Sequence, residues 1–374
     1  MNTIDQDELA QHLRQNKVII DVRSPGEFVQ GALPGSINLP ILNDSERHDV
    51  GLCFKTDGQA AAILLGHQIV SGATLETRCS QWAEHVKHDP QAILTCFRGG
   101  LRSQSAQKFL HDKGTAIKRL DGGYKAARTQ LLDVIQHFSQ PLVILTGSTG
   151  SGKTHVLNSI SLFYPAIDLE GLAQHRGSAF GAWDIAQPSQ ADFENRFAVK
   201  LLQIKPADTH VPLLLEDESR MIGHRHIPEV FFTKMRESAV VLLIEPIENR
   251  IENIFVDYIS TKLNAQSTNE NVTSVLAAYK NSVQKIKNKL GGARAQELLL
   301  DMDACETEFN NYRSFEKNKI WIEKLLVWYY DPMYQGSLEK RNPQITFRGA
   351  SEAVKDYFFA QKLQVQKELQ VPAP

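Results

Sequence analysis

The octapeptide GSTGSGKT, at residues 147–154, constrains the fold more strongly than any other segment of the chain. It fits the pattern G-x-x-x-x-G-K-[ST] and stands between the apolar run PLVILT and the helical segment HVLNSISLF. A strand that turns into a helix through such a loop directs backbone N–H groups and the positive end of the helix dipole at a phosphate. The segment therefore predicts an α/β domain with a phosphate site where one strand ends.

The fixed positions of this loop have expected parts in binding. The backbone around Gly147, Gly150 and Gly152 would cradle a diphosphate. Lys153 would reach its terminal phosphate, and Thr154 would ligate Mg²⁺ if the reaction uses a metal. The motif by itself is typical of ATP or GTP sites, so a nucleotide is one candidate ligand.

Two more segments of this half carry charged residues beside predicted strands. The run VPLLLEDES places Glu216, Asp217 and Glu218 at a strand end, where a carboxylate could hold metal or water. Spacing does not distinguish among these three residues, and we name Asp217 as the candidate. The segment IDLEGLAQHRG places Asp168 at another strand end, followed by Arg176, which could contact a second anion or an RNA backbone. The alternative for both segments is a capping or solvated turn.

A second anion-binding loop is expected in the segment CFRGGLRSQ, which starts at Cys96 after the apolar run AILT. A cysteine where a strand enters a loop and then a helix lies in the field of the loop N–H groups, which favours the nucleophilic thiolate. Arg98 and Arg102 would add positive charge, and Gly99 and Gly100 let the backbone curl. The alternative is a buried packing cysteine, which would not need an anion cradle after it.

The chain is expected to form two domains. Residues 1–138 alternate short apolar runs with helical segments, which predicts a parallel sheet with crossover helices. A Gly-Gly turn and a helix close this part, and Pro141 opens a new strand. Residues 139–374 predict a second α/β domain, which carries the phosphate loop and becomes mostly helical from about residue 267.

Composition narrows the classes of function. The chain has no run of eighteen apolar residues and no secretory signal pattern, so we expect a cytoplasmic protein without membrane contact. Its four cysteines lie far apart and show no metal-ligand spacing with histidines, so neither a disulfide framework nor a structural zinc site is predicted. The net charge of -2 means that an RNA partner would need a local basic patch.

The first domain resembles the rhodanese-like domains. The segment IIDVRSPGEFVQGALPGSINLP follows that family's opening pattern, and LDGGYKA resembles its closing turn. The matching positions are Asp21, Arg23, Glu27, Phe28, Gly31, Gly35, Asn38 and Pro40. The resemblance implies that Cys96 is the nucleophile that carries a chalcogen. Five residues separate Cys96 from Arg102, as in the dual-specificity phosphatases, and this longer loop favours a tetrahedral donor that bears phosphate over thiosulfate.

The whole chain resembles the tRNA 2-selenouridine synthases. The blocks ERHDVG, GHQIVSG, CFRGGLRS, DGGYKA, DLEGLAQHRGSAFG, LEDESRMIG, YYDPMY and FRG occur in that family's order. The resemblance implies a transferase that replaces the 2-thio sulfur of the wobble uridine by selenium from selenophosphate. It also implies geranyl transfer to that sulfur from geranyl diphosphate, which would make the sulfur a better leaving group.

The same resemblance implies a tRNA partner that presents its anticodon loop, and an enzyme that makes selenophosphate as a candidate second partner. On this interpretation Cys96 and Arg102 handle selenophosphate, while the loop with Lys153 binds geranyl diphosphate or, as the motif alone would suggest, a nucleotide. Candidate RNA contacts are aromatic or basic, each with packing or a solvated helix face as the alternative. They are Trp328, Tyr329, Tyr330, Tyr334, Lys285, Lys287, Lys289 and Arg294.

Two other functions also explain a pair of anion loops. A phosphatase or ordinary sulfurtransferase fused to a nucleotide kinase would act on small molecules without RNA. A nucleotide-gated RNA-binding protein would use the first domain as a scaffold, and Cys96 could then be replaced by serine without loss of function. Neither alternative explains the ordered blocks of the long resemblance.

Overall fold

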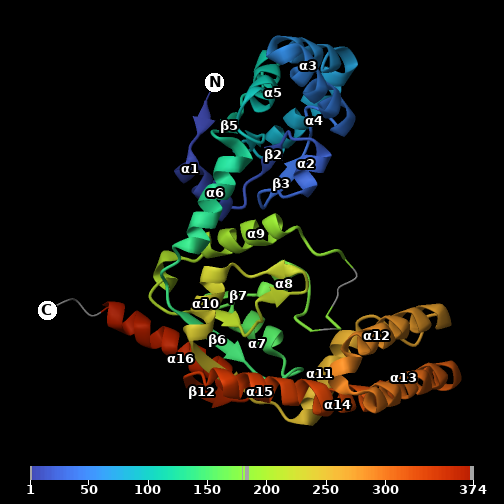
Figure 1. The fold of residues 1–374 in the computed structure, drawn as a ribbon. Coiled ribbons are helices and arrows are strands. Elements are labelled where there is room, and N and C mark those ends of the chain that lie inside the picture. Colours follow the sequence, from blue (N-terminus) through green and yellow to red (C-terminus); the bar gives the residue numbers. More distant parts are fainter. Residues whose placement is uncertain (1, 179, 182–184, 371–374) are drawn as a thin grey trace. The chain divides into compact units, whose positions relative to one another are not determined.

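The computed structural model describes residues 2–178, 180–181 and 185–370, without the side chains of 369 and 370 (Figure 1). Contacts divide the chain into two compact units. One consists of Met1–Phe138 with Pro188–Ile204, and the other of Ser139–Gln187 with Lys205–Pro374. Across the described ranges, no helix has both the length and the apolar character needed to cross a bilayer.

The first unit is built on a five-stranded parallel sheet, in the order β1-β5-β4-β2-β3. The strands are β1 (Thr3–Ile4), β2 (Ile19–Asp21), β3 (Ser36–Asn38), β4 (Ile93–Thr95) and β5 (Lys118–Leu120). The helices are α1 (Gln6–Arg14), α2 (Pro25–Val29), α3 (Asp44–Ile69), α4 (Gly72–His88), α5 (Leu101–Asp112), α6 (Gly123–Gln136) and α9 (Gln190–Leu202). Every residue of β2 and β4 is buried, as a central strand covered on both faces requires.

Helix α9 joins the first unit although its sequence follows the phosphate loop. The sequence predicts this segment in the second domain, and the structure instead packs α9 on α1 and α6. Phe193 and Phe197 bury their rings there, and Arg128 of α6 pairs with Glu194 and donates to Asn195 Oδ1 at 2.9 Å. The helix has an apolar face that local pattern cannot assign to one sheet or the other.

The second unit contains a five-stranded parallel sheet in the order β12-β11-β6-β8-β7 and a small antiparallel hairpin. The strands are β6 (Leu142–Thr146), β7 (Ala166–Ile167), β8 (Leu213–Glu216), β9 (Met221–Ile222), β10 (Arg225–His226), β11 (Ala239–Leu243) and β12 (Ile345–Gly349). The central strand β6 is buried throughout, and the predicted phosphate loop leaves its carboxyl end. The α/β class predicted for both halves of the chain is confirmed.

The helices of this unit fall into two sets. Those close to the sheet are α7 (Lys153–Ile160), α8 (Leu169–Ala173), α10 (Glu229–Glu237), α11 (Ile247–Phe255), α15 (Asp331–Arg341) and α16 (Ser351–Gln370), with the short 3-10 helix η1 (Pro206–Asp208). The π-helical segments η2 (Val256–Ser260) and η3 (Leu326–Tyr330) contribute buried residues to the core of the helical part. The others are α12 (Asn269–Leu290), α13 (Gly292–Tyr312) and α14 (Asn318–Leu325), and α12 and α13 lie side by side as a hairpin (Figure 1).

A separate hydrophobic core holds the helical part together. Tyr279 of α12, Phe309 of α13 and Trp321 of α14 are buried in it. Tyr329, a candidate RNA contact, is only 7% exposed in the same core, and Trp328 and Tyr330 pack against it. For these aromatic residues the packing alternative describes the structure better than base stacking does.

Candidate functional site

Cys96 lies directly after β4, at the floor of a pocket of about 840 Å³. The residue is only 2% exposed. The thiol donates to Ser103 Oγ at 3.2 Å, and the Ser103 hydroxyl donates to the Gly100 carbonyl, also at 3.2 Å. Sequence reasoning did not select Ser103. The only signal that could have identified it was its position in the first turn of α5.

The turn at residues 121–125 holds the cysteine loop from behind. Tyr124 N–H donates to the Cys96 carbonyl at 2.8 Å, and Lys125 N–H donates to the Phe97 carbonyl at 2.9 Å. Gly123 has φ +60°, and a Cβ there would lie 2.3 Å from the Cys96 oxygen, so only glycine fits. Gly99 and Gly100 complete the loop.

The loop therefore offers donors to a ligand. The carbonyls of Cys96 and Phe97 accept from the turn behind the loop, whereas the N–H groups of residues 98–102 have no acceptor within the described part of the chain. Helix α5 begins at Leu101, so the positive end of its dipole adds to these groups. Such a loop binds a tetrahedral oxyanion.

Arginines dominate the pocket wall, but most of them already have acidic partners. The lining includes five arginines and the carboxylates Glu27 and Asp44. Arg102 pairs with Glu27, which also receives Arg47 at 3.2 Å. Arg98 lies with its guanidinium 5.8 Å from the Phe97 ring centre and has no ion pair among the residues that the structure describes. The predicted positive charge of Arg102 is thus partly neutralised, which its sequence position could not reveal.

The ionised form of Glu27 is favoured by its arginine partners. Burial raises the pKa of this carboxyl, but the hydrogen bonds and charge of Arg102 outweigh burial and lower its pKa to about 2. An anion entering the pocket would compete with Glu27 for Arg102.

The phosphate loop at 147–152 connects β6 to α7, as the motif predicted. Neighbouring atoms leave little room for a Cβ at Gly147, Gly150 or Gly152. A Cβ on Gly150 would come 2.8 Å from the Arg250 backbone oxygen. Lys153 Nζ donates to the Gly147 carbonyl at 3.0 Å, across the loop.

Helix α11 fixes this loop from outside. Arg250 Nε donates to the Thr149 carbonyl and Asn253 Nδ2 to the Gly150 carbonyl, both at 2.9 Å. Arg250 in turn pairs with Asp331 of α15. Sequence reasoning missed Arg250 and Asn253, because they lie about a hundred positions after the loop and carry no motif.

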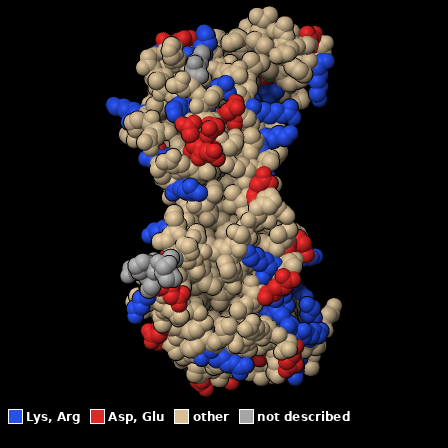
Figure 2. Space-filling view, turned by 90° about the vertical axis from the view of Figure 1, so that its left-hand side faces the viewer, with Lys and Arg blue, Asp and Glu red and all other residues tan. Residues whose placement is uncertain are grey.

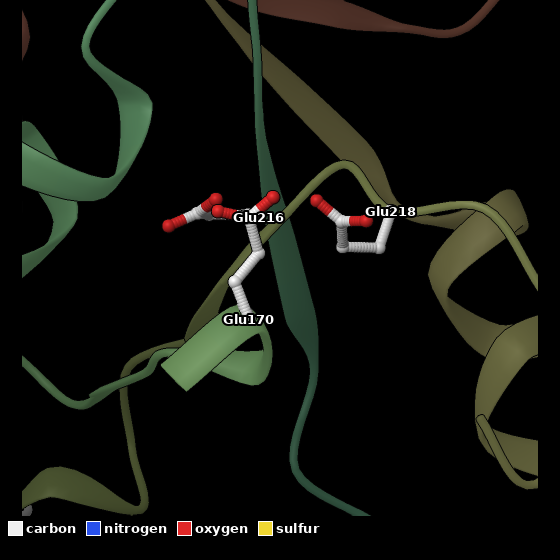
Figure 3. Close-up of side chains that lie close together, drawn as sticks. All are labelled: Glu170, Glu216 and Glu218. Carbon is white, nitrogen blue, oxygen red and sulfur yellow. The ribbon is translucent and has the colours of Figure 1, made fainter. Parts of the chain in front are cut away.

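Three carboxylates gather beside Thr154. Glu170, Glu216 and Glu218 each direct one oxygen to a common point, with these atoms within 4.8 Å of one another (Figure 3). The Thr154 hydroxyl lies 3.3 Å from oxygens of both Glu170 and Glu216. The second oxygen of Glu216, Oε1, is buried and lacks a hydrogen-bond partner among the described residues.

Electrostatics makes this cluster suited to a cation. Burial, together with the charge of Glu170, raises the pKa values of Glu216 and Glu218 well above the usual range, while Lys153 opposes the rise. A divalent cation would relieve this repulsion, and oxygen ligands beside a loop threonine suit Mg²⁺. The Cys and His spacing in the sequence spoke only against a structural zinc site, and it does not bear on a cluster of carboxylates.

Asp217, the candidate named from sequence, does not reach Thr154. Side chains alternate along β8 and its continuation, so Glu216 and Glu218 point to one side and Asp217 to the other. Asp217 accepts two hydrogen bonds from Arg341 at 2.6 Å and one from the Thr146 hydroxyl at 2.6 Å. Its partners make it a link between β8 and the end of α15.

Asp168 and Arg176 have local structural roles. Asp168 caps α8 by accepting from Gly171 N–H at 2.7 Å, and burial raises its pKa. Arg176 donates to the Asp257 carbonyl at 2.8 Å and lies over the Tyr258 ring at 4.9 Å. Arg176 therefore packs against η2. Its Arg-Gly sequence had suggested an anion contact instead.

Comparison with known proteins confirms the resemblance in both halves. Residues 5–130 match the model of the rhodanese-like domain, and residues 140–365 match the model of the tRNA 2-selenouridine synthase AAA domain. Among relatives named tRNA 2-selenouridine synthase, that of Nitrosomonas europaea is 43% identical, covering 92% of this chain and 95% of its own. Those of Bdellovibrio bacteriovorus (43% identical, 93% and 96% covered) and Pseudomonas fluorescens (42%, 91% and 94%) are similar. With both domain models matched and relatives of this identity aligned nearly end to end, the chain belongs to the tRNA 2-selenouridine synthase family.

Proposed function

We propose that this protein is a transferase that replaces the 2-thio sulfur of the wobble uridine of tRNA by selenium, with selenophosphate as donor. We further propose that the sulfur is first geranylated from geranyl diphosphate. The observation that carries the proposal is the presence of two unlike anion sites in one chain. One has a cysteine beneath free N–H groups, and the other has a phosphate loop beside three carboxylates.

Geranyl transfer is assigned to the phosphate loop. A lone pair of the thiocarbonyl sulfur forms the bond to C1 of the geranyl group, the C1–O bond breaks toward the diphosphate, and uridine N3 loses its proton. Lys153 would leave its contact with the Gly147 carbonyl to neutralise the departing diphosphate. Mg²⁺ held by Thr154 and the carboxylates of Glu170, Glu216 and Glu218 would supply further positive charge.

Selenium transfer is assigned to the Cys96 pocket. The phosphate group of the donor would bind to the N–H groups of residues 98–102 and to Arg98, and would draw Arg102 from Glu27. Selenium adds to C2 of the base, the C2–S bond breaks, and geranyl thiol leaves with a proton. Water then cleaves the Se–P bond, giving phosphate and the 2-selenouridine. Cys96 is assigned to the contact with selenium, with its thiol proton available to the leaving sulfur.

Positive and negative side chains are interspersed over the face in Figure 2. Binding of the tRNA phosphates would therefore need a local basic surface. Lys285, Lys287 and Lys289 lie exposed near the end of α12, and none has an ion pair in the described ranges. We propose that these lysines contact phosphates of the tRNA, which must present its target base out of the stack.

A nucleotide is the second candidate for the phosphate loop. A pocket of about 410 Å³ adjoins the loop at Ser151 and Gly152, and its lining includes His155, Asn249 and Lys355. A largely polar lining suits a nucleobase better than a hydrocarbon chain. Calorimetric titration of the protein with geranyl diphosphate, ATP and GTP, each with Mg²⁺, separates the two ligands.

The proposal is tested by nucleoside mass spectrometry. Purified protein is incubated with tRNA containing 2-thiouridine, geranyl diphosphate and selenophosphate, and the nucleosides are then analysed. The proposal expects 2-selenouridine, with S-geranyl-2-thiouridine as the product when selenophosphate is omitted. Unchanged 2-thiouridine with both donors present would contradict it, and turnover of thiosulfate or a phosphate ester without RNA would favour the small-molecule alternative.

A further inference from the structure

Another pocket, of about 680 Å³, lies in the first unit within the bend of α3. Helix α3 is broken at Gly58, which has φ +84°, into the arms 44–57 and 59–69. Residues from both arms line the pocket, and α5 contributes Leu101, Ser105 and Phe109. The left-handed conformation at Gly58 therefore creates the concave wall.

The lining of this pocket is mostly apolar. Leu42, Val50, Ile63 and Phe109 contribute hydrocarbon surface, and no carboxylate lies among the described lining residues. Leu52 and Phe54 belong to the same wall, although they are 54% and 55% exposed. Large apolar side chains exposed around a concave surface indicate an apolar ligand.

The apolar pocket adjoins the Cys96 pocket. Arg47, Leu101 and Arg102 line both of them. On one side of these residues lie the free N–H groups and Arg98, and on the other side lies hydrocarbon. The combined site thus matches a ligand with a reacting polar centre and an apolar tail.

We propose that the apolar pocket binds the geranyl chain of the S-geranylated base while its C2 atom is held at the Cys96 loop. This inference rests on the function proposed above. The geranyl chain is the apolar part of that intermediate, and its removal from water would favour the geranylated base over the bare 2-thiouridine. The same pocket would hold geranyl thiol as it leaves, which keeps the leaving sulfur beside C2.

A matched pair of leucines on α3 tests the site. Leu52 lines the pocket, whereas Leu64 does not and is 65% exposed. Leu52→Ser removes part of the wall, and Leu64→Ser is the control for the same change on the same helix. Gly51→Trp is the second variant, since a Cβ at Gly51 meets no atom within 4 Å and the indole can occupy the pocket.

The measurement is the affinity of each protein for an anticodon stem-loop RNA that carries S-geranyl-2-thiouridine or S-methyl-2-thiouridine. Wild type and Leu64→Ser are expected to bind the geranyl RNA about tenfold or more tightly than the methyl RNA, because only geranyl fills the pocket. In Leu52→Ser and Gly51→Trp the ratio should fall by about fivefold or more.

Equal ratios in all four proteins, or equal losses in Leu52→Ser and Leu64→Ser, would overturn the inference. Selenation of the geranyl RNA by wild type is measured alongside with selenophosphate. If wild type selenates that RNA without preferring the geranyl group, the inference fails and the proposed function stands. If wild type selenates neither RNA, the proposed function fails and the inference fails with it.

Discussion

Glu27 controls how much positive charge Arg102 can offer to an anion. Its pKa is lowered to about 2 from a usual value of 4.5, with Arg102 as the cause that outweighs burial. Replacing Glu27 by glutamine should free Arg102, so we expect the KM for selenophosphate to fall severalfold. The KM is measured by selenation kinetics on the geranyl RNA, and an unchanged or higher KM would contradict this role.

The same carboxyl should give the first unit a pH-dependent stability. Since its pKa is lower in the folded state, its contribution is fully present above about pH 4.5 and is lost as the pH falls toward 2. Urea unfolding of wild type and Glu27→Gln at pH 3 and pH 6 should show a smaller pH effect in the variant. Glu76→Gln removes an exposed carboxylate paired with Lys113 and is the control. Equal pH effects in wild type and Glu27→Gln would refute the prediction.

The carboxylate cluster makes a prediction about metal binding. At a concentration about 100 times its Kd, Mg²⁺ should raise the Tm of wild type by about 5–10 °C. Glu216→Gln should lose this rise, because it removes a ligand oxygen from the cluster. Asp217→Asn is the matched control, since Asp217 pairs with Arg341 and points away. Loss of the Mg²⁺ effect in both variants, or in neither, would mean that the cluster is not the site.

Candidate site residues were predictable from sequence where one motif contains both the residue and the loop that positions it. Cys96 begins a loop, and Lys153 and Thr154 directly follow one, and the conformation of both loops follows from nearby glycines and the next helix. The pairing of Arg102 with Glu27 and the meeting of Glu170 with Glu216 depend on how separate elements pack. Asp217 shows most clearly what spacing alone could not predict. Side chains alternate along the strand and its continuation, so Asp217 points to the side opposite Glu216 and Glu218.

At the level of elements, α9 illustrates what local pattern leaves open. Phe193→Ala should destabilise the first unit by about 3–5 kcal/mol, because it empties a fully buried site between α9 and that unit. Lys200→Ala, at an exposed position on the same helix, should leave stability within about 0.5 kcal/mol of wild type. Chemical denaturation measures both, and similar values for the two variants would show that α9 does not belong to the first unit's core.

A further prediction concerns tRNA binding at the exposed end of α12. Replacing Lys285, Lys287 and Lys289 by glutamine should weaken binding of all tRNAs alike. The slope of log affinity against log salt concentration should become shallower by about one unit for each phosphate that a lysine no longer neutralises. Filter binding between low and moderate salt measures this slope. Lys280→Gln, on the same helix, should not change the slope, because Asp303 and Glu306 already neutralise Lys280. An unchanged slope in the triple variant would place the tRNA elsewhere.

For the molecule as a whole, each unit contains one candidate anion site built from its own residues. The cysteine loop is held by the turn at 121–125 of the first unit, and the phosphate loop by α11 of the second. The α/β class and both loops follow from sequence because strand, loop and helix are contiguous there. The bend of α3 occurs at the single glycine Gly58, and the discontinuous first unit follows from contacts between distant segments, which no local pattern encodes.

The central claim is that the two loops perform successive steps, and a bypass measurement tests it most directly. Wild type, Cys96→Ala and Lys153→Ala are each given geranyl diphosphate and selenophosphate with RNA that carries either 2-thiouridine or S-geranyl-2-thiouridine, and nucleosides are identified by mass spectrometry. Lys153→Ala should make 2-selenouridine from the geranylated RNA but at least about 100-fold less from the thio RNA. Cys96→Ala should geranylate the thio RNA and stop there. If Lys153→Ala is equally inactive on both RNAs, or if Cys96→Ala cannot geranylate, the two loops do not divide the reaction in this way.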